Sequence, residues 1–372
     1  MSRKVEFLNL RCTYEEVREE VEPALLRSVA SGRYIGGPEV EAFEGAFARY
    51  CGAAHCVGVG NGLDALHLSL KAMGVGAGDE VIVSSNGYIA TWLAVSMAGA
   101  VPVPVEPLPS THNLDPDRVE QAITPRTKVI LPTHLYGQAA DMDPILEIAA
   151  ARGCYVLEDA AQAHGARYKE RRVGAHGHAV AWSFYPSKNL GAFGDAGAVT
   201  TNDAALAERV RVLGNYGSSV RYVNEVRGIN SRLDPLQAAV LLVKLKHLDR
   251  WNESRSRTAQ RYTAGLQGLG LALPAVPQWA DPAWHLYVVR SPQRDRLQAA
   301  LKEAGVETLI HYPIPPYRQK AYSDLHWDGE AFPIADELAG EVLSLPIGPH
   351  MAAEEVDYVI ETVRRFADGG CG

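Results

Sequence analysis

Short apolar runs recur along the first two thirds of the chain, and amphipathic stretches separate them. The runs are apolar almost throughout, without the alternation that a solvent-exposed face would impose, which predicts strands buried on both faces. They are VIVS (81–84), VPVPVE (101–106), KVILPTHL (128–135), CYVLEDA (154–160), AVAWSFYP (179–186) and GAVTTN (197–202). Between such runs, Leu63, Leu66, Leu70 and Met73 share one face of a predicted helix. This alternation predicts an α/β fold with a mostly parallel sheet flanked by helices.

The pattern changes after about residue 233. A helical periodicity starts at Asp234-Pro235 and continues through a charged stretch, which predicts one bridge helix over 233–262. A strand, HLYVVR (285–290), and a helix, RLQAALKEAG (296–305), follow it. A chain of 372 residues is also longer than one small core usually supports. We therefore expect a large domain over 1–245 and a smaller C-terminal α/β domain over 246–372.

Charge, hydropathy and cysteine usage exclude several classes of protein. A net charge of -8 argues against a nucleic-acid partner, which would need a basic face. No apolar stretch approaches the length of a membrane span, and the first 20 residues lack the apolar core of a signal peptide. The five cysteines (Cys12, Cys51, Cys56, Cys154 and Cys371) form no CxxC pair, so neither disulfides nor a metal cage is expected. A cytoplasmic protein without a membrane partner is the simplest expectation.

A glycine turn joins a strand to a helix at Gly58-Val59-Gly60-Asn61-Gly62-Leu63. Backbone N–H groups at such a helix N-terminus form an anion site suited to phosphate, although an ordinary tight turn would look the same. A dinucleotide-binding fingerprint would need a third glycine where Leu63 stands, so a nicotinamide oxidoreductase is disfavoured.

Asp159 directly follows the apolar run YVLE. Open α/β sheets bind ligands at the carboxyl ends of their strands, and a carboxylate there could keep a pyridine nitrogen protonated. The alternative is an N-cap for a helix that begins at Ala160. Gln162 and His164, just beyond, could reach a ligand or serve as structural residues.

Lys188 follows another predicted strand, in SFYPSKNLG, and precedes the glycine-rich GAFGDAGAV. Partial desolvation would lower the pKa of this amine and free it to form an imine with a carbonyl compound. The alternative is a solvated loop lysine. Tyr88, after the strand VIVS, could stack on a flat cofactor or simply pack against the sheet.

Taken together, these residues resemble the DegT/StrS-type sugar aminotransferases, which are fold type I enzymes dependent on pyridoxal phosphate. The resemblance spans nearly the whole chain, from YIGGPEVEAFE (34–44) to LSLPIGPHM (343–351). Its central blocks are THLYGQAADMDPI, LEDAAQAHGARY, SFYPSKNLGAFGDAGAV, GINSRLDPLQAAVL and LIHYPIP. A dehydratase of this family would carry histidine in place of Lys188, so an aminotransferase is implied.

The resemblance also implies residue roles. Lys188 matches the lysine that binds the cofactor and moves protons, Asp159 the acid facing the ring nitrogen, Gln162 the residue near the ring hydroxyl, and Tyr88 the stacking aromatic. The implied phosphate contacts are Gly62, Leu63 and Ser183, with Asn230 lent by a partner subunit. A homodimer with shared active sites is therefore implied. The family usually has PSNT before the aromatic residue, whereas this chain has Ser84-Ser85-Asn86-Gly87.

Within the family, the chain most resembles enzymes that aminate C3 of dTDP-linked 3-keto-6-deoxyhexoses, with L-glutamate as the donor. Positions implied to face the nucleotide sugar are Tyr185, Arg221, His311 and Tyr312. A C4 aminotransferase acting on a 4-keto sugar and a non-catalytic pyridoxal-phosphate sensor are the alternatives.

Overall fold

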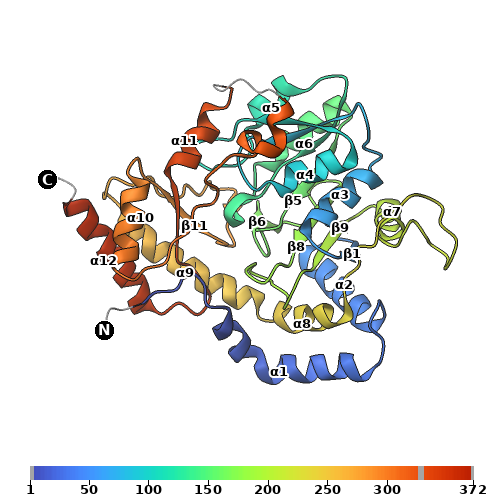
Figure 1. The fold of residues 1–372 in the computed structure, drawn as a ribbon, viewed down its shortest axis with the longest axis horizontal. Coiled ribbons are helices and arrows are strands. Elements are labelled where there is room, and N and C mark those ends of the chain that lie inside the picture. Colours follow the sequence, from blue (N-terminus) through green and yellow to red (C-terminus); the bar gives the residue numbers. More distant parts are fainter. Residues whose placement is uncertain (1–3, 326–330, 370–372) are drawn as a thin grey trace.

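The computed structural model describes residues 4–325 and 331–369, and its central feature is a seven-stranded sheet (Figure 1). β9 alone runs against the others, because it pairs antiparallel with both of its neighbours while the remaining pairs are parallel. The mostly parallel sheet is therefore confirmed. In spatial order the strands are β1 (His55–Val59), β9 (Gly197–Thr201), β8 (Ala179–Ser183), β5 (Tyr155–Asp159), β4 (Thr127–Leu131), β2 (Glu80–Ser84) and β3 (Val101–Val105).

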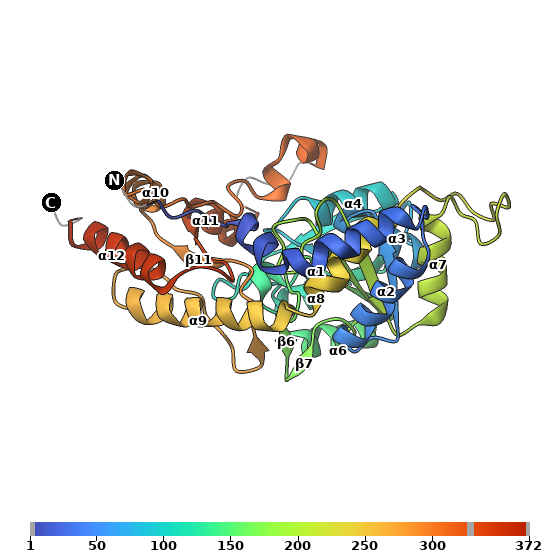
Figure 2. The ribbon, with the colours of Figure 1, turned by 90° about the horizontal axis from the view of Figure 1, so that it is seen from below.

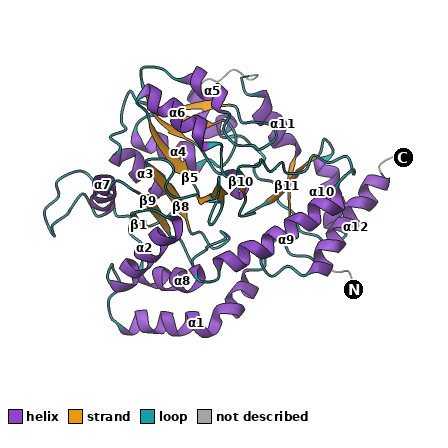
Figure 3. Ribbon diagram, turned by 180° about the vertical axis from the view of Figure 1, so that it is seen from behind, coloured by secondary structure: helices purple, strands orange, loops and turns teal. Residues whose placement is uncertain are grey.

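Both faces of the sheet are buried, which explains the continuous apolar runs. In β2, Val81 and Val83 belong to the apolar cluster on one face, and Ile82 belongs to the cluster on the other. Figure 3 shows the strands between layers of helices. The first cluster takes in α3 (Gly62–Ala72), α4 (Ala90–Ala98) and α7 (Ala204–Gly214). The second takes in α2 (Pro38–Cys51), α5 (Pro116–Ala122), α6 (Met142–Arg152) and α8 (Pro235–Leu245).

The predicted single bridge helix over 233–262 is wrong, because two helices occupy this stretch. α8 ends at Leu245, and α9 (Leu248–Leu266) begins after Lys246 and His247. At the junction the N–H groups of Lys246 and His247 bond to carbonyls three residues back, 3.2 and 3.0 Å away. This tighter turn changes the direction of the axis, and α9 leads away from the sheet towards the C-terminal part (Figure 2).

The C-terminal part has a core of its own. The antiparallel strands β11 (Tyr287–Arg290) and β12 (Val342–Leu345) pack with α9, α10 (Arg294–Glu303) and α12 (Ala353–Gly369). Val5 joins this core from the other end of the chain by pairing with Val306. The division at residues 245 and 246 stays a prediction.

The remaining elements are short or peripheral, apart from the long first helix. α1 (Leu10–Ala30) packs against α8 along the lower edge of the view in Figure 1. The others are β6 (Arg167–Tyr168), β7 (Arg171–Arg172), β10 (Ala280–Asp281), α11 (Pro333–Glu341), and the 3-10 turns η1 (Leu135–Gly137), η2 (Pro316–Arg318) and η3 (Lys320–Leu325). Within residues 4–325 and 331–369, none of the helices is long and apolar enough to cross a membrane. Cys12, Cys51, Cys56 and Cys154 are free thiols, and Cys371 lies outside the described residues.

Candidate functional site

The predicted site residues lie where strands of one direction end. β1, β2, β5 and β8 run the same way, so their carboxyl ends share one edge of the sheet. Asp159 is the last residue of β5, Lys188 follows β8, and Tyr88 follows β2. The turn from β1 into α3 opens at the same edge. This is the edge at which open α/β sheets bind ligands.

Lys188 is a partly buried amine facing Asp159. Its backbone N–H donates to the carbonyl of Tyr185 at 2.8 Å, which closes the loop after β8. Desolvation lowers the pKa of Lys188 to about 8, and the Asp159 carboxylate opposes that shift. A solvated loop lysine is therefore not what the fold provides. An amine of this pKa is partly neutral near pH 8 and can act as a nucleophile.

Asp159 is 6% exposed and is held by hydrogen bonds on both carboxylate oxygens. The Thr91 hydroxyl donates to Oδ2 at 2.8 Å, and the N–H of Ala161 donates to Oδ1 at 3.1 Å. The alternative of a helix N-cap is wrong, because residues 160–166 form turns rather than a helix. Both oxygens are therefore held in place, and a carboxylate fixed in this way suits a partner that carries a positive charge.

Gln162 connects Asp159's loop to the aromatic residues of the site. Its Oε1 accepts the N–H of Tyr136 at 2.6 Å, and its Nε2 donates to the Tyr312 hydroxyl at 3.0 Å. The Tyr312 ring lies 5.2 Å from the ring of Tyr88, which is 56% exposed. Burial, and then the charge of Asp159, raise the pKa of Tyr312, so this hydroxyl stays neutral. Tyr88 thus presents an open aromatic face beside a buried polar group.

The phosphate candidates Gly62 and Ser183 lie against each other. A Cβ atom on Gly62 would lie 2.6 Å from the Cβ of Ser183, so only glycine permits this approach of α3 to the end of β8. The Asn61 side chain caps the N–H of Asp64 at 2.9 Å, and the Ser231 hydroxyl accepts the N–H of Gly60 at the same distance. Gly62 and Leu63 therefore head α3, where a helix offers N–H groups to an anion.

Two predicted residues lie outside the strand ends, on a segment between two helices. Arg221 and Asn230 are exposed residues of the segment between α7 and α8, which projects from the body beside α7 (Figures 1 and 2). The Arg221 guanidinium lies 4.9 Å from the centre of the Tyr222 ring. Tyr185, by contrast, belongs to the Lys188 loop and is 55% exposed.

His311 reaches the site from the C-terminal part. Its Nδ1 lies 2.8 Å from the Ser344 hydroxyl, and its carbonyl accepts a hydrogen bond from Tyr136. Burial, followed by the nearby charge of Lys188, lowers the pKa of His311 to about 4, so the ring is neutral at ordinary pH.

Sequence reasoning missed two other groups of the site, Thr91 and His285, and named a third, His164, as a residue that could reach a ligand or serve as a structural residue. Thr91 supports Asp159, as described above. His164 is fully buried between Trp182 and Phe184, whose ring centres are 5.2 and 5.6 Å away. His285 is a second buried histidine whose pKa is lowered by burial and then by Lys188. Only the block EDAAQAHG offered a signal, for His164. Nothing local distinguishes Thr91 or His285 from other polar residues.

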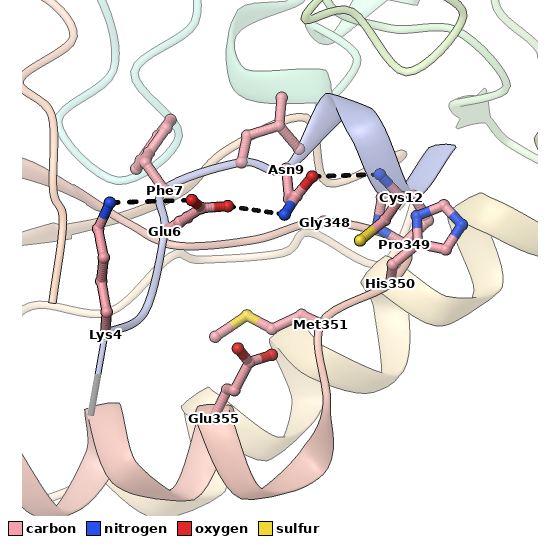
Figure 4. A pocket seen from close by; sticks show the side chains of 11 residues that line it. Lys4, Glu6, Phe7, Asn9, Cys12, Gly348, Pro349, His350, Met351 and Glu355 are labelled. Carbon is pink, nitrogen blue, oxygen red and sulfur yellow. Dashed lines mark hydrogen bonds and ion pairs between the residues drawn. The ribbon is translucent and has the colours of Figure 1, made fainter. Parts of the chain in front are cut away.

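A cavity of about 350 Å³ lies elsewhere, between the N-terminal segment and the start of α12 (Figure 4). Lys4, Glu6 and Asn9 line it and are joined by an ion pair and a hydrogen bond, and Met351 lines its other side. It contains none of the predicted site residues. A much smaller cavity, of about 10 Å³, borders the strand-end site and is lined by Tyr136, His311 and Tyr312. The converging amine, carboxylate and neutral imidazoles, rather than cavity size, identify the strand-end site as the candidate active site.

Comparison with known proteins agrees with this geometry. The model of the DegT/DnrJ/EryC1/StrS aminotransferase family matches residues 15–364. The Saccharopolyspora erythraea protein named erythromycin biosynthesis sensory transduction protein EryC1 is 59% identical, over 98% of this chain and 100% of its own. The dTDP-3-amino-3,4,6-trideoxy-alpha-D-glucose transaminase of Streptomyces venezuelae is 53% identical, over 98% of this chain and 97% of its own.

The same fold is seen in a crystal structure of S. venezuelae DesV in complex with a ketimine intermediate. The TM-score is 0.97 at 53% identity, covering 98% of this chain and 99% of that one. The partly buried amine, the hydrogen-bonded carboxylate and the N-terminus of α3 beside Ser183 fit the aldehyde, ring nitrogen and phosphate of pyridoxal phosphate. The chain therefore belongs to the DegT/DnrJ/EryC1/StrS aminotransferase family and is a sugar aminotransferase dependent on pyridoxal phosphate.

Proposed function

We propose that this protein transfers an amino group from L-glutamate to C3 of a dTDP-linked 3-keto-6-deoxyhexose. One observation carries the chemistry: a desolvated lysine amine faces a hydrogen-bonded carboxylate at the ligand-binding edge of the sheet. The substrate class rests on the S. venezuelae transaminase, which covers almost the whole chain at 53% identity.

Pyridoxal phosphate would be held by groups from several elements. Lys188 would bind its aldehyde carbon, Asp159 would face its ring nitrogen, Gln162 would lie near its ring hydroxyl, and Tyr88 would stack on the ring. Gly62, Leu63 and Ser183 would contact the phosphate, joined by Asn230 from a partner subunit. When bound, the cofactor supplies an electron sink that makes the carbon bearing the amine acidic.

The chain's own residues then control the proton. Lys188, with its pKa lowered to about 8, can accept a proton from the amino donor in one half-reaction and deliver a proton to the acceptor sugar in the other. The Thr91 hydroxyl and the Ala161 N–H both donate to the Asp159 carboxylate and so fix its two oxygens. The neutral rings of His285 and His311 add no competing positive charge beside Lys188.

The nucleotide sugar would meet Tyr185, His311 and Tyr312 at the open side of the site, and Arg221 from the projecting segment. Tyr185 and Tyr88 are more than half exposed, which leaves the entrance to the Lys188 site open in the single chain. We propose that a second copy completes it, in a homodimer acting in the cytoplasm.

The first experiment is the absorbance spectrum of the purified protein loaded with pyridoxal phosphate. Glutamate should abolish the band of the bound cofactor, and a dTDP-3-keto-6-deoxyhexose should restore it. Recovery with the 4-keto isomer alone would favour a C4 aminotransferase instead.

A sensor is the second candidate, because the S. erythraea relative is named a sensory transduction protein. A sensor would bind the cofactor without transferring an amino group to any keto sugar.

Replacing Lys188 with alanine tests the central residue. We expect the K188A variant to lose turnover while still binding pyridoxamine phosphate, because the other contacts to the cofactor remain. Steady-state kinetics and a binding titration measure the two effects. Turnover at the wild-type rate would refute the assignment of Lys188.

A further inference from the structure

A buried polar network lies directly behind Lys188. Asn189, the next residue, is 5% exposed, and its side chain uses its hydrogen-bonding groups in three directions. Its Nδ2 donates to the carbonyl of Ala283 at 2.7 Å and to Oδ1 of Asn252 at 2.9 Å. Its Oδ1 lies 3.2 Å from Nδ1 of His285. The Lys188 loop is therefore anchored from behind by α9 and by the segment that leads into β11.

These contacts determine which nitrogen of His285 carries the proton. A backbone carbonyl can only accept, so Nδ2 of Asn189 must face Ala283 and Oδ1 must face His285. An amide oxygen can only accept as well, so Nδ1 of His285 is the donor. The ring is neutral because burial, followed by the charges of Lys188 and Arg255, lowers its pKa well below the usual value. Nε2 is therefore the nitrogen with the free lone pair.

The network continues around the lysine. Nδ2 of Asn252 donates to the carbonyl of His164 at 2.8 Å, and the pKa of His164 is lowered to about 3 by burial and then by Lys188. Burial and then the charge of Lys188 lower the pKa values of His164, His285 and His311, and the Asp159 carboxylate in turn opposes the lowering of the amine's pKa by burial. The Asn189 network is what holds the loop that carries this amine.

We propose that Asn189 and His285 are positioning residues for Lys188: they fix the lysine loop against α9 and the C-terminal part and keep the amine in its water-poor position. This inference rests on the proposed role of Lys188, but it concerns the amine rather than the sugar. A loss of either anchor lets the loop move and lets water reach the amine.

The test measures how readily the Lys188 amine is acetylated as the pH changes. The full-length, cofactor-free chain is labelled with acetic anhydride across a range of pH, and the acetylation of Lys188 is followed by mass spectrometry, with exposed Lys246 as a reference. In the wild type the labelling midpoint should lie near pH 8. In N189A it should rise towards 10.5, which lowers the rate of labelling at pH 7 by about tenfold for each unit of the rise.

Two variants of His285 distinguish the effect of its hydrogen bond to Asn189 from the effect of its packing in the core. H285A removes the N–H that Asn189 accepts, whereas H285N keeps an N–H near the place of Nδ1. We expect H285A to raise the midpoint as N189A does, and H285N to leave it close to the wild-type value. If N189A does not fold, this pair decides the question by itself.

Asn113 provides a control for the general cost of losing a buried asparagine. It is 2% exposed and also has three bonds, because Nδ2 donates to Gln138 and Ala139 carbonyls and Oδ1 accepts the N–H of Leu135. N113A should lower the melting temperature without moving the Lys188 midpoint. The proposal is overturned if N189A and H285A lower the melting temperature as N113A does and leave the midpoint unchanged.

The absorbance of the holoenzyme gives a second readout that does not depend on turnover. The pH dependence of the bound cofactor's spectrum should shift in N189A and H285A and stay in place in H285N and N113A. A normal Lys188 midpoint with no activity on any keto sugar would contradict the proposed substrate while leaving this inference intact.

Discussion

Asp159 depends on a single side-chain donor, the hydroxyl of Thr91, for one of its two oxygens. Valine has nearly the same shape as threonine but no hydroxyl, so T91V leaves Oδ2 of a 6% exposed carboxylate without that bond. A hydrogen bond to a charged group contributes about 1.5 to 3 kcal/mol, and we expect a loss of that order in the free energy of unfolding. The catalytic constant should fall as well. Denaturant unfolding and steady-state kinetics measure both.

T91S is the control, because it keeps the donor and removes only a methyl group. It should lie much closer to the wild type than T91V in catalytic constant. Equal catalytic constants for T91V and the wild type would mean that Asp159 needs no support from α4.

Among single residues, the sequence predicted those reactive side chains that come directly after a strand. Asp159 and Lys188 directly follow apolar runs, and the ends of parallel strands meet at one edge, so their proximity could be predicted. Thr91 and His285 could not, because each acquires its role from a partner far away in the sequence. The distance from Thr91 to Asp159 along the chain is 68 residues, and that from His285 to Asn189 is 96.

The start of α3 is sensitive to side-chain size. G62A would place a methyl group 2.6 Å from Ser183 Cβ and 3.2 Å from its Cα, so α3 and β8 must move apart. We expect weaker binding of pyridoxal phosphate and a loss of stability of about 1 to 3 kcal/mol. Cofactor titration and thermal unfolding check this. G340A in α11 is the control, since a Cβ there meets nothing within 4 Å, and it should be neutral or slightly stabilising.

Glu158 joins three segments beneath the site and is fully buried. Its Oε1 accepts the N–H groups of His176 and Gly177 at 3.1 and 2.6 Å, and its Oε2 lies 2.8 Å from Nε2 of His134. Nδ1 of His134 accepts the N–H of Ala140, so Nε2 carries the proton and donates. Burial alone would raise the pKa of Glu158, but the hydrogen bonds that it accepts from His134 and Gly177 outweigh burial, so its pKa is lowered.

The pH dependence of stability should reflect this carboxylate. A lowered pKa gives stability that is present above the ordinary value of 4.5 and is lost as the pH falls below it. We expect urea unfolding of the wild type to show a steeper loss of stability below pH 4.5 than E158Q shows. At pH 7 the variant should be less stable by roughly 1 to 3 kcal/mol, because the amide NH2 group of glutamine leaves one of the buried N–H donors without an acceptor. Parallel curves would mean that Glu158 is not ionised in the folded protein.

The sequence predicted where helices and strands lie better than it predicted the direction of a strand or a break within a helical stretch. The apolar pattern located the strands, but it carries no information on direction, so β9 could not be identified as the reversed strand. The break between α8 and α9 also has no sequence signal, because Lys246 and His247 are neither glycine nor proline and the apolar phase runs through them. The N–H groups of these two residues bond to the carbonyl three residues back, instead of four as in an α-helix, and only the three-dimensional structure reveals this.

The protein exposes apolar side chains on the segment between α7 and α8. The segment between α7 and α8 projects from the body (Figure 2), with Val220 62% exposed and Tyr222 85% exposed. Apolar groups on a protruding segment favour coverage by a partner. Asn230 belongs to the same segment, so a homodimer would let it reach the phosphate site of the other copy.

Mixed dimers test this sharing. K188A has no lysine but keeps Asn230, and N230D keeps Lys188 but would place a carboxylate against the phosphate of its partner's site. A dimer with one chain of each has one site with both native residues if Asn230 acts across the interface. Since half of randomly mixed dimers are hybrids with one of two sites restored, about a quarter of the wild-type activity should return.

Mixing K188A with D159N is the matched control, because Lys188 and Asp159 face each other within one chain and no pairing rebuilds a complete site. That mixture should stay inactive. If N230D and K188A also stay inactive together, while light scattering shows dimers, Asn230 acts within its own chain or not at all. The projecting segment would then need another partner for its apolar side chains, and the open entrance at Tyr185 would have to be closed by the chain's own C-terminal part.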